Sequence, residues 1–348
     1  MARNLARGSG FTEPAKALSS LFTGFDHRHA GSFYQRDYDH QGLVFFTRPR
    51  MNLSYNNLVN DRHMLPLATT RGDSIYRAIR TMLDPRIHDY QNGEGAVSDL
   101  FDHRQAFIPI LSNLCLNLSG FPDVTLETYD SPEGMRKESW SMVDDIADIN
   151  NTFDITANFA NIPGDPITTF FHMWTRYMAN VYTDQMVPYP DMVMENEIDY
   201  QTRIYRIRLD KSKRFVKKIG CANVAFPVAA PLGVSFNYDR QQPFDEDNQQ
   251  VSIPFRCVGA EYNDPILVRE FNLTVELFNR SMRDGSREYV YHPLTPAEAE
   301  LFNFEGYPRI NETTLELQWW VSRQEYNRVM EDYQWQTTIN DIGSVAQI

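Results

Sequence analysis

Eight histidines and several groups of acidic residues are the side chains of this 348-residue chain that could bind metal or transfer protons. Imidazole and carboxylate groups are common zinc ligands and common general acids and bases. The histidines lack an HExxH pattern, and none lies at metal-ligand spacing from a cysteine. They are His27, His29, His40, His63, His88, His103, His172 and His292.

Two acidic groupings come closest to a site. Asp26–His29 together with Asp37–His40 place carboxylates beside imidazoles and could hold a metal loosely, but solvated side chains in a polar arm are the simpler interpretation. Asp144, Asp145 and Asp148 could raise one another's pKa by repulsion, although an exposed loop also accounts for them.

No GxSxG, P-loop, GxGxxG or CxxC pattern occurs in the chain. The three cysteines, Cys115, Cys221 and Cys257, are an odd number and lie in apolar or strand-like segments, which favours small buried hydrophobic side chains. We therefore predict no catalytic residue, no cofactor-binding residue, no metal ligand and no cofactor. The chain is expected not to be an enzyme.

The net charge of −13 argues against a surface that binds nucleic acid, because phosphate contacts need clustered lysine and arginine. It is compatible with a conduit whose negative wall repels passing DNA, and equally with solubility alone. No charged and then apolar leader opens the chain, and no apolar run approaches the ~20 residues of a membrane span. We expect a protein assembled in a reducing cytoplasm, without a membrane partner.

The region from Tyr200 to Tyr262 alternates apolar and polar residues as β-strands do. Arg203–Leu209 predicts one strand, Asp210–Lys213 a turn, and Arg214–Cys221 a second strand. Next come a turn at Asn223, Phe226 and Pro227, a short strand over Val234–Tyr238, a polar loop over Asp239–Gln250, and a strand whose inward face is Val251, Ile253, Phe255 and Cys257. Strands with one apolar face each require a barrel or sandwich.

This order of elements resembles the tail-tube fold of contractile-tailed bacteriophages. The resemblance rests on the hairpin, the Asn-x-x-Phe-Pro turn, the Val234-x-Phe236-x-Tyr238 strand and the Pro254-Phe255 segment, and the FFTRP segment from Phe45 to Pro49 adds support. It implies an α+β, mainly β fold: an antiparallel β-barrel or sandwich with one packed helix, an N-terminal arm and a C-terminal extension.

Capping signals predict the helices. Asp73 is expected to cap a helix over Ser74–Leu83, and Asp165-Pro166 to open the one long helix, which continues to about Thr183. Thr295–Glu298 and Ser322–Glu325 read as capping boxes that open short helices. Further strands are expected at Leu43–Leu53 (stopped by Pro49), Val124–Tyr129, Glu138–Met142, Thr152–Phe159, Ile266–Phe278 and Thr314–Val321, and Ala106–Leu118 is either a strand or a buried helix.

We divide the chain into four segments: an extended arm (1–42), an N-terminal extension (43–105), the tail-tube-like β domain (106–280) and a C-terminal αβ extension (281–348). The resemblance implies a virion structural protein that forms a homo-hexameric ring of the tail tube, of the baseplate tube-initiator or hub type. Its expected partners are copies of itself and other tube, sheath or baseplate proteins, with DNA passing through the lumen without specific binding.

Three alternatives remain open: a neck or connector protein, a major tail tube protein, and a tail-associated glycan hydrolase that works through paired carboxylates. The surplus of residues beyond the barrel argues against a plain tube protein. The hydrolase lacks an evident groove of aromatic and carboxylate residues. Replacing Phe226 or Phe255 with aspartate is expected to abolish folding or ring assembly.

Overall fold

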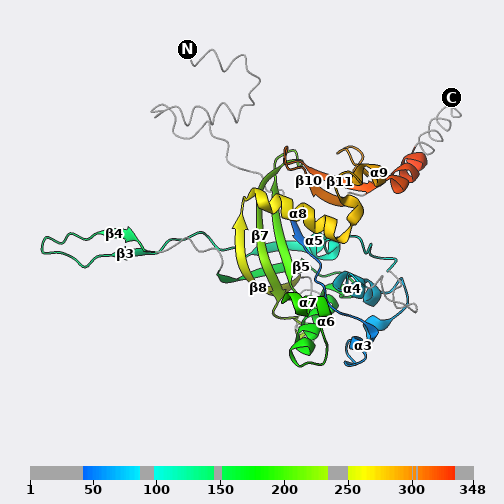
Figure 1. Ribbon diagram of the computed structural model, residues 1–348, viewed down its shortest axis with the longest axis horizontal. Helices are drawn as coiled ribbons and strands as arrows, with labels where there is room; N and C mark the ends of the chain where they lie inside the picture. The colour runs from blue at the N-terminus through cyan, green and yellow to red at the C-terminus, as the bar shows by residue number, and fades with distance from the viewer. Residues whose placement is uncertain are drawn as a thin grey trace, which may run out of the picture. The chain divides into compact units, whose positions relative to one another are not determined.

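The computed structural model describes residues 42–86, 98–144, 151–233, 250–299, 301–302 and 305–333 (Figure 1). The arm over residues 1–41 and the strand predicted at Val234–Tyr238 lie outside these ranges, as does most of the loop predicted over Asp239–Gln250. The described part of the chain is mixed α and β, with strands as its framework, as predicted.

A six-stranded antiparallel sheet forms the framework, in the order β1-β6-β7-β8-β5-β2. The sheet curls into a nearly closed barrel, so that Arg206 on β6 lies close enough to Cys115 on β2, the far edge strand, to affect the pKa of its thiol. The strands are β1 (Gly42–Phe46), β2 (Cys115–Ser119), β5 (Thr152–Ala160), β6 (Thr202–Leu209), β7 (Val216–Pro227) and β8 (Gln250–Tyr262).

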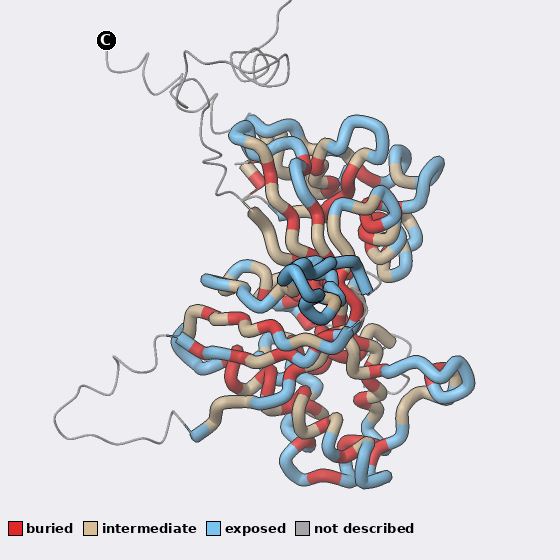
Figure 2. The backbone as a smooth tube through the Cα atoms, turned by 90° about the vertical axis from the view of Figure 1, so that its left-hand side faces the viewer, coloured by how far each residue is buried: buried red, intermediate tan, exposed pale blue. Residues whose placement is uncertain are grey.

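Both faces of this sheet are apolar, and each belongs to a separate core. Successive residues of a strand point to opposite faces, so Phe46 enters one core with Phe255, while Phe45 enters the other with Phe271. Buried and less buried residues accordingly alternate along the strands in Figure 2. The barrel therefore needs a cover on each face.

Two long helices provide these covers. Helix α6 (Pro166–Tyr182) packs Phe171 against Phe159 and Phe255 in the first core. Helix α8 (Pro265–Phe278) packs Phe271 against Phe45 and Tyr205 in the second. The prediction of α6 is confirmed, whereas the strand predicted at Ile266–Phe278 is wrong, because that segment is α8.

The C-terminal residues extend the second core. Strands β9 (Tyr291–Pro293), β10 (Tyr307–Ile310) and β11 (Leu317–Ser322) form an antiparallel sheet in the order β10-β11-β9. Asn272 on α8 joins this sheet, because its side chain donates to the Ile310 carbonyl at 2.8 Å and accepts from the Ile310 amide at 2.9 Å. Short helices η4 (Arg280–Met282) and α9 (Arg287–Val290) precede β9, and residues 323–333 are helical.

A lobe of short elements covers α6 from the other side. It comprises α3 (Tyr55–Leu58), η1 (Leu65–Ala68), α4 (Ile75–Leu83) and α7 (Pro190–Glu195), while α5 (Pro109–Leu114) lies beside β1. The buried Arg48 ties this lobe to the barrel. Its guanidinium donates to the carbonyls of Met82 (3.0 Å), His103 (2.7 Å), Gln105 (3.1 Å) and Thr81.

Several local predictions need correction. Strand β1 ends at Phe46, before Pro49. The turn expected at Asn223–Pro227 is the second half of β7, which pairs with β8 as far as Pro227. The Ala106–Leu118 segment contains a helix and then a strand, α5 and β2. Residues 296–299 form turns instead of a helix, although the predicted reciprocal hydrogen bonds between Thr295 and Glu298 are present.

Two predicted helix caps are also wrong. Asp73 is paired with Arg71 and does not cap α4, whose N-cap residue is Ser74. Asp165 occupies the N-cap position of α6 with a left-handed backbone, but its side chain accepts from Asn161 and makes no capping bond. The Pro at the first position of α6 is present as predicted. Ser322 does accept from the amide of Glu325, as the second capping box requires.

Candidate assembly surface

The residues that could have carried chemistry do not converge. Among the described residues, no group of three or more His, Cys, Asp or Glu side chains could hold a metal ion. His27, His29, His40 and His88, with Asp145 and Asp148, fall outside those residues, and Asp144 is exposed. Nor does any described helix have the length and apolar character needed to cross a membrane.

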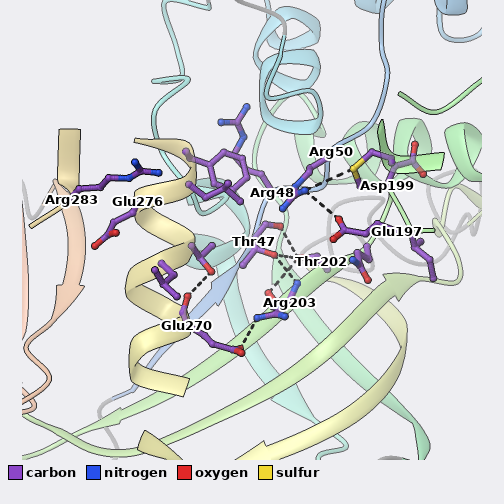
Figure 3. Close-up of a pocket in the computed structure, with 17 residues that line it drawn as sticks. Thr47, Arg48, Arg50, Glu197, Asp199, Thr202, Arg203, Glu270, Glu276 and Arg283 are labelled. Atoms are coloured by element: carbon purple, nitrogen blue, oxygen red, sulfur yellow. Dashed lines mark hydrogen bonds and ion pairs between the residues drawn. The ribbon is translucent and has the colours of Figure 1, made fainter. Parts of the chain in front are cut away.

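A cleft of about 480 Å³ lies between the start of β6, the loop before it and α8 (Figure 3). Four of its charged side chains form two ion pairs within the cleft. Arg203 donates to Glu270 at 2.7 Å and Arg50 to Glu197 at 3.2 Å. The lining contains no serine, cysteine, histidine or lysine. The ion pair between Arg203 and Glu270 therefore joins α8 to β6 across the cleft.

One carboxyl group in this cleft has a raised pKa. Burial of Asp199 raises the pKa of its side chain, opposed by the hydrogen bond that the Tyr177 hydroxyl donates to it. Burial and the nearby Asp199 also raise the pKa of Tyr177 far above its usual value. A shifted carboxyl group in a cleft is a typical sign of acid-base catalysis. Here Asp199 is 3% exposed and its carboxylate accepts the hydrogen bond from Tyr177, which favours a structural role.

A group of exposed apolar residues lies instead on a β-hairpin that follows β2. Strands β3 (Thr128–Asp130) and β4 (Ser141–Val143) pair only with each other, and every residue in them is exposed. Figure 1 draws this hairpin standing apart from the barrel. An isolated two-stranded hairpin is at best marginally stable in water, so this one needs a surface to cover it.

One face of the hairpin gathers the large side chains. Tyr129 lies opposite Met142, and the next pair on the same face toward the tip is Ser131 with Trp140. Residues directly opposite each other share a face. Tyr129, Met142 and Trp140 are 48%, 58% and 73% exposed. An apolar strip of this size on a narrow ribbon is typical of an interaction surface.

The sheet edges are a second unpaired surface. Strand β1 pairs only with β6, and β2 pairs only with β5, among the strands that the structure describes. A bridge from Thr47 to Phe107 covers the end of β1. On β2, Leu116 is 56% exposed. Open edge strands are templates for pairing with another chain.

A match to a known family identifies the kind of protein that carries these two surfaces. Residues 1–335 match the family described as "Putative phage tail tube protein". The chain belongs to the phage tail tube protein family. The sequence resemblance to tail-tube proteins is thus confirmed, and the projecting hairpin and open edges belong to a structural component of a phage tail.

The tail tube protein also has partial similarity to solved components of contractile injection systems. It is 11% identical to the tube-terminating cap of the anti-feeding prophage, with a TM-score of 0.28, over 45% of this chain and 82% of that one. It is 12% identical to a PVC sheath/tube terminator, with a TM-score of 0.26, over 45% and 87%. No curated protein sequence matches the chain.

The β segments predicted at Val124–Tyr129 and Glu138–Met142 lie close to β3 and β4. The prediction did not include the projection of this hairpin from the barrel. The available signal was the mixture of exposed-type charges and large apolar residues on both arms, with Gly134 near the tip. A strand that packs on its own core would carry charges on one face only.

Proposed function

We propose that this tail tube protein assembles into a homo-hexameric ring of the tube at the baseplate, as a tube-initiator or hub component. The observation that carries the proposal is the β3–β4 hairpin with its exposed Tyr129, Met142 and Trp140. The hairpin has no core of its own, so a neighbouring copy provides the surface that it lacks. Heterologous contacts of this kind form a ring when the rotation between neighbouring copies closes, and we propose closure after six copies.

The elements beyond the barrel support a position at the baseplate. The lobe of α3, η1, α4 and α7 and the sheet β10-β11-β9 both add surfaces that a ring stacked only on its own copies does not need. We propose that segments 1–42, 43–105 and 281–348 bind other tube, sheath or baseplate proteins, and that 106–280 forms the ring wall. DNA passes through the lumen without specific binding, consistent with the net charge of −13.

Self-association of the purified protein tests the proposal. Light scattering and negative-stain microscopy should show six-fold rings at micromolar concentration. Replacing Trp140 and Met142 with glutamate should leave the protein folded and monomeric, because both side chains are exposed within the subunit. A matched control replaces Tyr182 and Tyr289, which are 90% and 82% exposed on other elements, with glutamate.

The outcomes separate the alternatives. A wild-type protein that stays monomeric at all concentrations, or a hairpin variant that still forms rings, contradicts the proposal. Long tubes without other components identify a major tube protein, and release of sugar from peptidoglycan identifies a hydrolase. Labelling one terminus and locating it in particle images distinguishes the baseplate from the neck.

A further inference from the structure

A cationic cavity of about 300 Å³ lies at the root of the hairpin. Arg206 and Arg208 on β6 and Lys218 on β7 line it, together with the rings of Phe121 and Tyr262. The strand register explains the cluster, because Arg208 lies opposite Lys218 and Arg206 opposite Gly220. Three cations thus share one region of a protein whose net charge is −13.

Two glycines leave room for this cavity. A Cβ atom at Gly42 would lie 1.9 Å from Nη1 of Arg206, and one at Gly220 would lie 3.2 Å from the ring of Tyr262. The Tyr262 hydroxyl donates to the Pro122 carbonyl at 2.6 Å and fixes the start of the hairpin beside the cavity. The aromatic and cationic walls are therefore held in place by the fold.

Two of the three cations, Arg206 and Lys218, have no carboxylate partner among the described residues. Arg206 donates only to backbone carbonyls, those of Leu43 (3.4 Å) and Ile207 (3.1 Å). Lys218 is exposed and forms no hydrogen bond or ion pair with any residue in the described ranges. A half-buried cation with carbonyl partners alone is incompletely compensated. The cavity fits an anionic group that arrives with apolar neighbours.

The hairpin carries the complementary charge. Its described residues 121–144 contain six acidic and two basic side chains. The Asp144 amide donates to the Glu127 carbonyl at 3.0 Å, which places these two carboxylates opposite each other on the face of Tyr129 and Met142. Like charges directly opposite each other destabilise a ribbon. A pair of cations from another molecule would remove that repulsion.

We propose that the hairpin of one copy docks at the cationic cavity of the next, with Glu127 and Asp144 facing Arg206 and Lys218 and with Tyr129 and Met142 against Phe121 and Tyr262. This inference rests on the proposed self-assembly and specifies its contact. The surfaces that meet are different parts of the chain, so the contact is head-to-tail and propagates around a ring. At ~3.3 Å per residue, Glu127 lies up to about 20 Å along the arm from Phe121 and Gly134 up to about 40 Å, so the hairpin extends far enough to contact another copy.

Charge reversal on both sides tests the contact. The cavity variant combines Arg206→Glu with Lys218→Glu, and the hairpin variant combines Glu127→Lys with Asp144→Lys. Each alone should weaken self-association of the full chain at least about tenfold, as measured by light scattering or sedimentation. An equimolar mixture of the two variants should regain it, because every contact in an alternating assembly then joins opposite charges.

Controls of equal charge lie far from both surfaces. Arg62→Glu with Arg269→Glu matches the cavity variant, and Glu195→Lys with Glu312→Lys matches the hairpin variant, since all four side chains are exposed. Both controls should associate as the wild type does. The hairpin variant keeps the test valid if the cavity variant fails to fold, because β3 and β4 lie outside both cores.

Different results overturn different statements. A wild-type protein that does not self-associate overturns both this contact and the proposed function. Wild-type assembly that persists in the hairpin variant, or a mixture that does not recover, overturns the contact alone. A disulfide that forms between Glu127→Cys and Lys218→Cys within one monomeric chain, and not between separately tagged chains, shows that the hairpin covers its own cavity and also overturns it.

Discussion

The carboxylate of Asp61 accepts a hydrogen bond from Nε of Arg176 at 2.6 Å and so joins the lobe below the barrel to α6. Asn180 on the next turn of α6 donates to the same carboxylate at 2.7 Å. Asp61 is 5% exposed. Burial raises the pKa of its carboxyl, but the bonds from Arg176, Asn180 and the His63 amide outweigh burial and hold the pKa well below the ordinary value.

This depressed pKa predicts a contribution to stability at neutral pH that is lost in acid. An acid whose folded pKa lies below its unfolded value of ~3.9 stabilises the fold above that pH, and the contribution disappears as pH falls toward the folded pKa. Asp61→Asn should lower the free energy of unfolding at pH 7 by about 2 kcal/mol and flatten its fall below pH 4. Urea unfolding at several pH values measures both effects.

The matched control is Asp154→Asn. Asp154 also pairs with an arginine, Arg256 at 2.9 Å, but both side chains are largely exposed, where ion pairs contribute little. No measurable change is expected at any pH. An equal loss in both variants would show that the buried position of Asp61 is unimportant.

The start of α8 supplies a second prediction. The Asp264 side chain accepts from the amide of Ile266 at 2.8 Å and caps the helix. Asp264→Ala should cost about 1 kcal/mol of unfolding free energy. Asp73→Ala is the control, since Asp73 precedes α4 without capping it, and should leave the unfolding midpoint unchanged. A larger effect at Asp73 than at Asp264 would contradict the observed caps.

The misassignment of α8 shows what sequence patterns can distinguish. Asp264-Pro265 repeats the Asp165-Pro166 signal that correctly predicted α6. The apolar residues of this segment also fit both the spacing of a helix and the alternation of a strand. Leu267, Phe271 and Val275 fit the helical spacing of four and are buried, yet every second residue from Leu267 to Leu277 is apolar except Arg269. Burial decides the question, because Leu273 and Leu277 are about half exposed.

Strand β8 was predictable because one of its faces is apolar from Val251 to Cys257. On β8, Val251, Ile253, Phe255 and Cys257 are all buried, as expected from the alternation. The paired charges around Asp61 and the cationic cavity could not be predicted, because their members come from strands or helices far apart in sequence. Only the register of β6 on β7 brings Arg208 to Lys218.

Thiol accessibility provides a third prediction. Burial raises the pKa of all three cysteines, that of Cys257 to about 12 and that of Cys221 further still. Cys115 is partly exposed, and the nearby Arg206 opposes the rise of its pKa. A thiol-specific chromogenic reagent should therefore modify one cysteine in the folded protein at pH 8 and all three in denaturant. The rate should increase with pH, because the thiolate is the reacting form.

Cys115→Ser is the control for this measurement and should remove the accessible thiol from the folded protein. Modification of two or more thiols in the folded wild type, at the rate of a free cysteine, would show that the barrel opens where β5, β7 and β8 pair.

The last prediction distinguishes Phe226 from Phe255, for which the sequence pattern alone predicts the same effect of substitution. Phe255 is fully buried, with its ring centroid 5.8 Å from those of Phe46 and Phe171. Phe226 is only partly buried and contacts one ring, that of Tyr200, at 5.9 Å. Phe255→Ala should cost about 3–5 kcal/mol and Phe226→Ala about 1–2 kcal/mol, because only the first leaves a large cavity.

The aspartate variants should differ more sharply. Phe255→Asp places an unpaired carboxylate between β8 and α6, and the protein should fail to fold. Phe226→Asp can turn its carboxylate toward water, so the protein should fold with a lower unfolding midpoint in urea. Circular dichroism of both variants tests the difference. Equal loss of structure would mean that the end of β7 is as essential to the barrel as its centre, and that the exposure of Phe226 in the subunit does not reflect its energetic role.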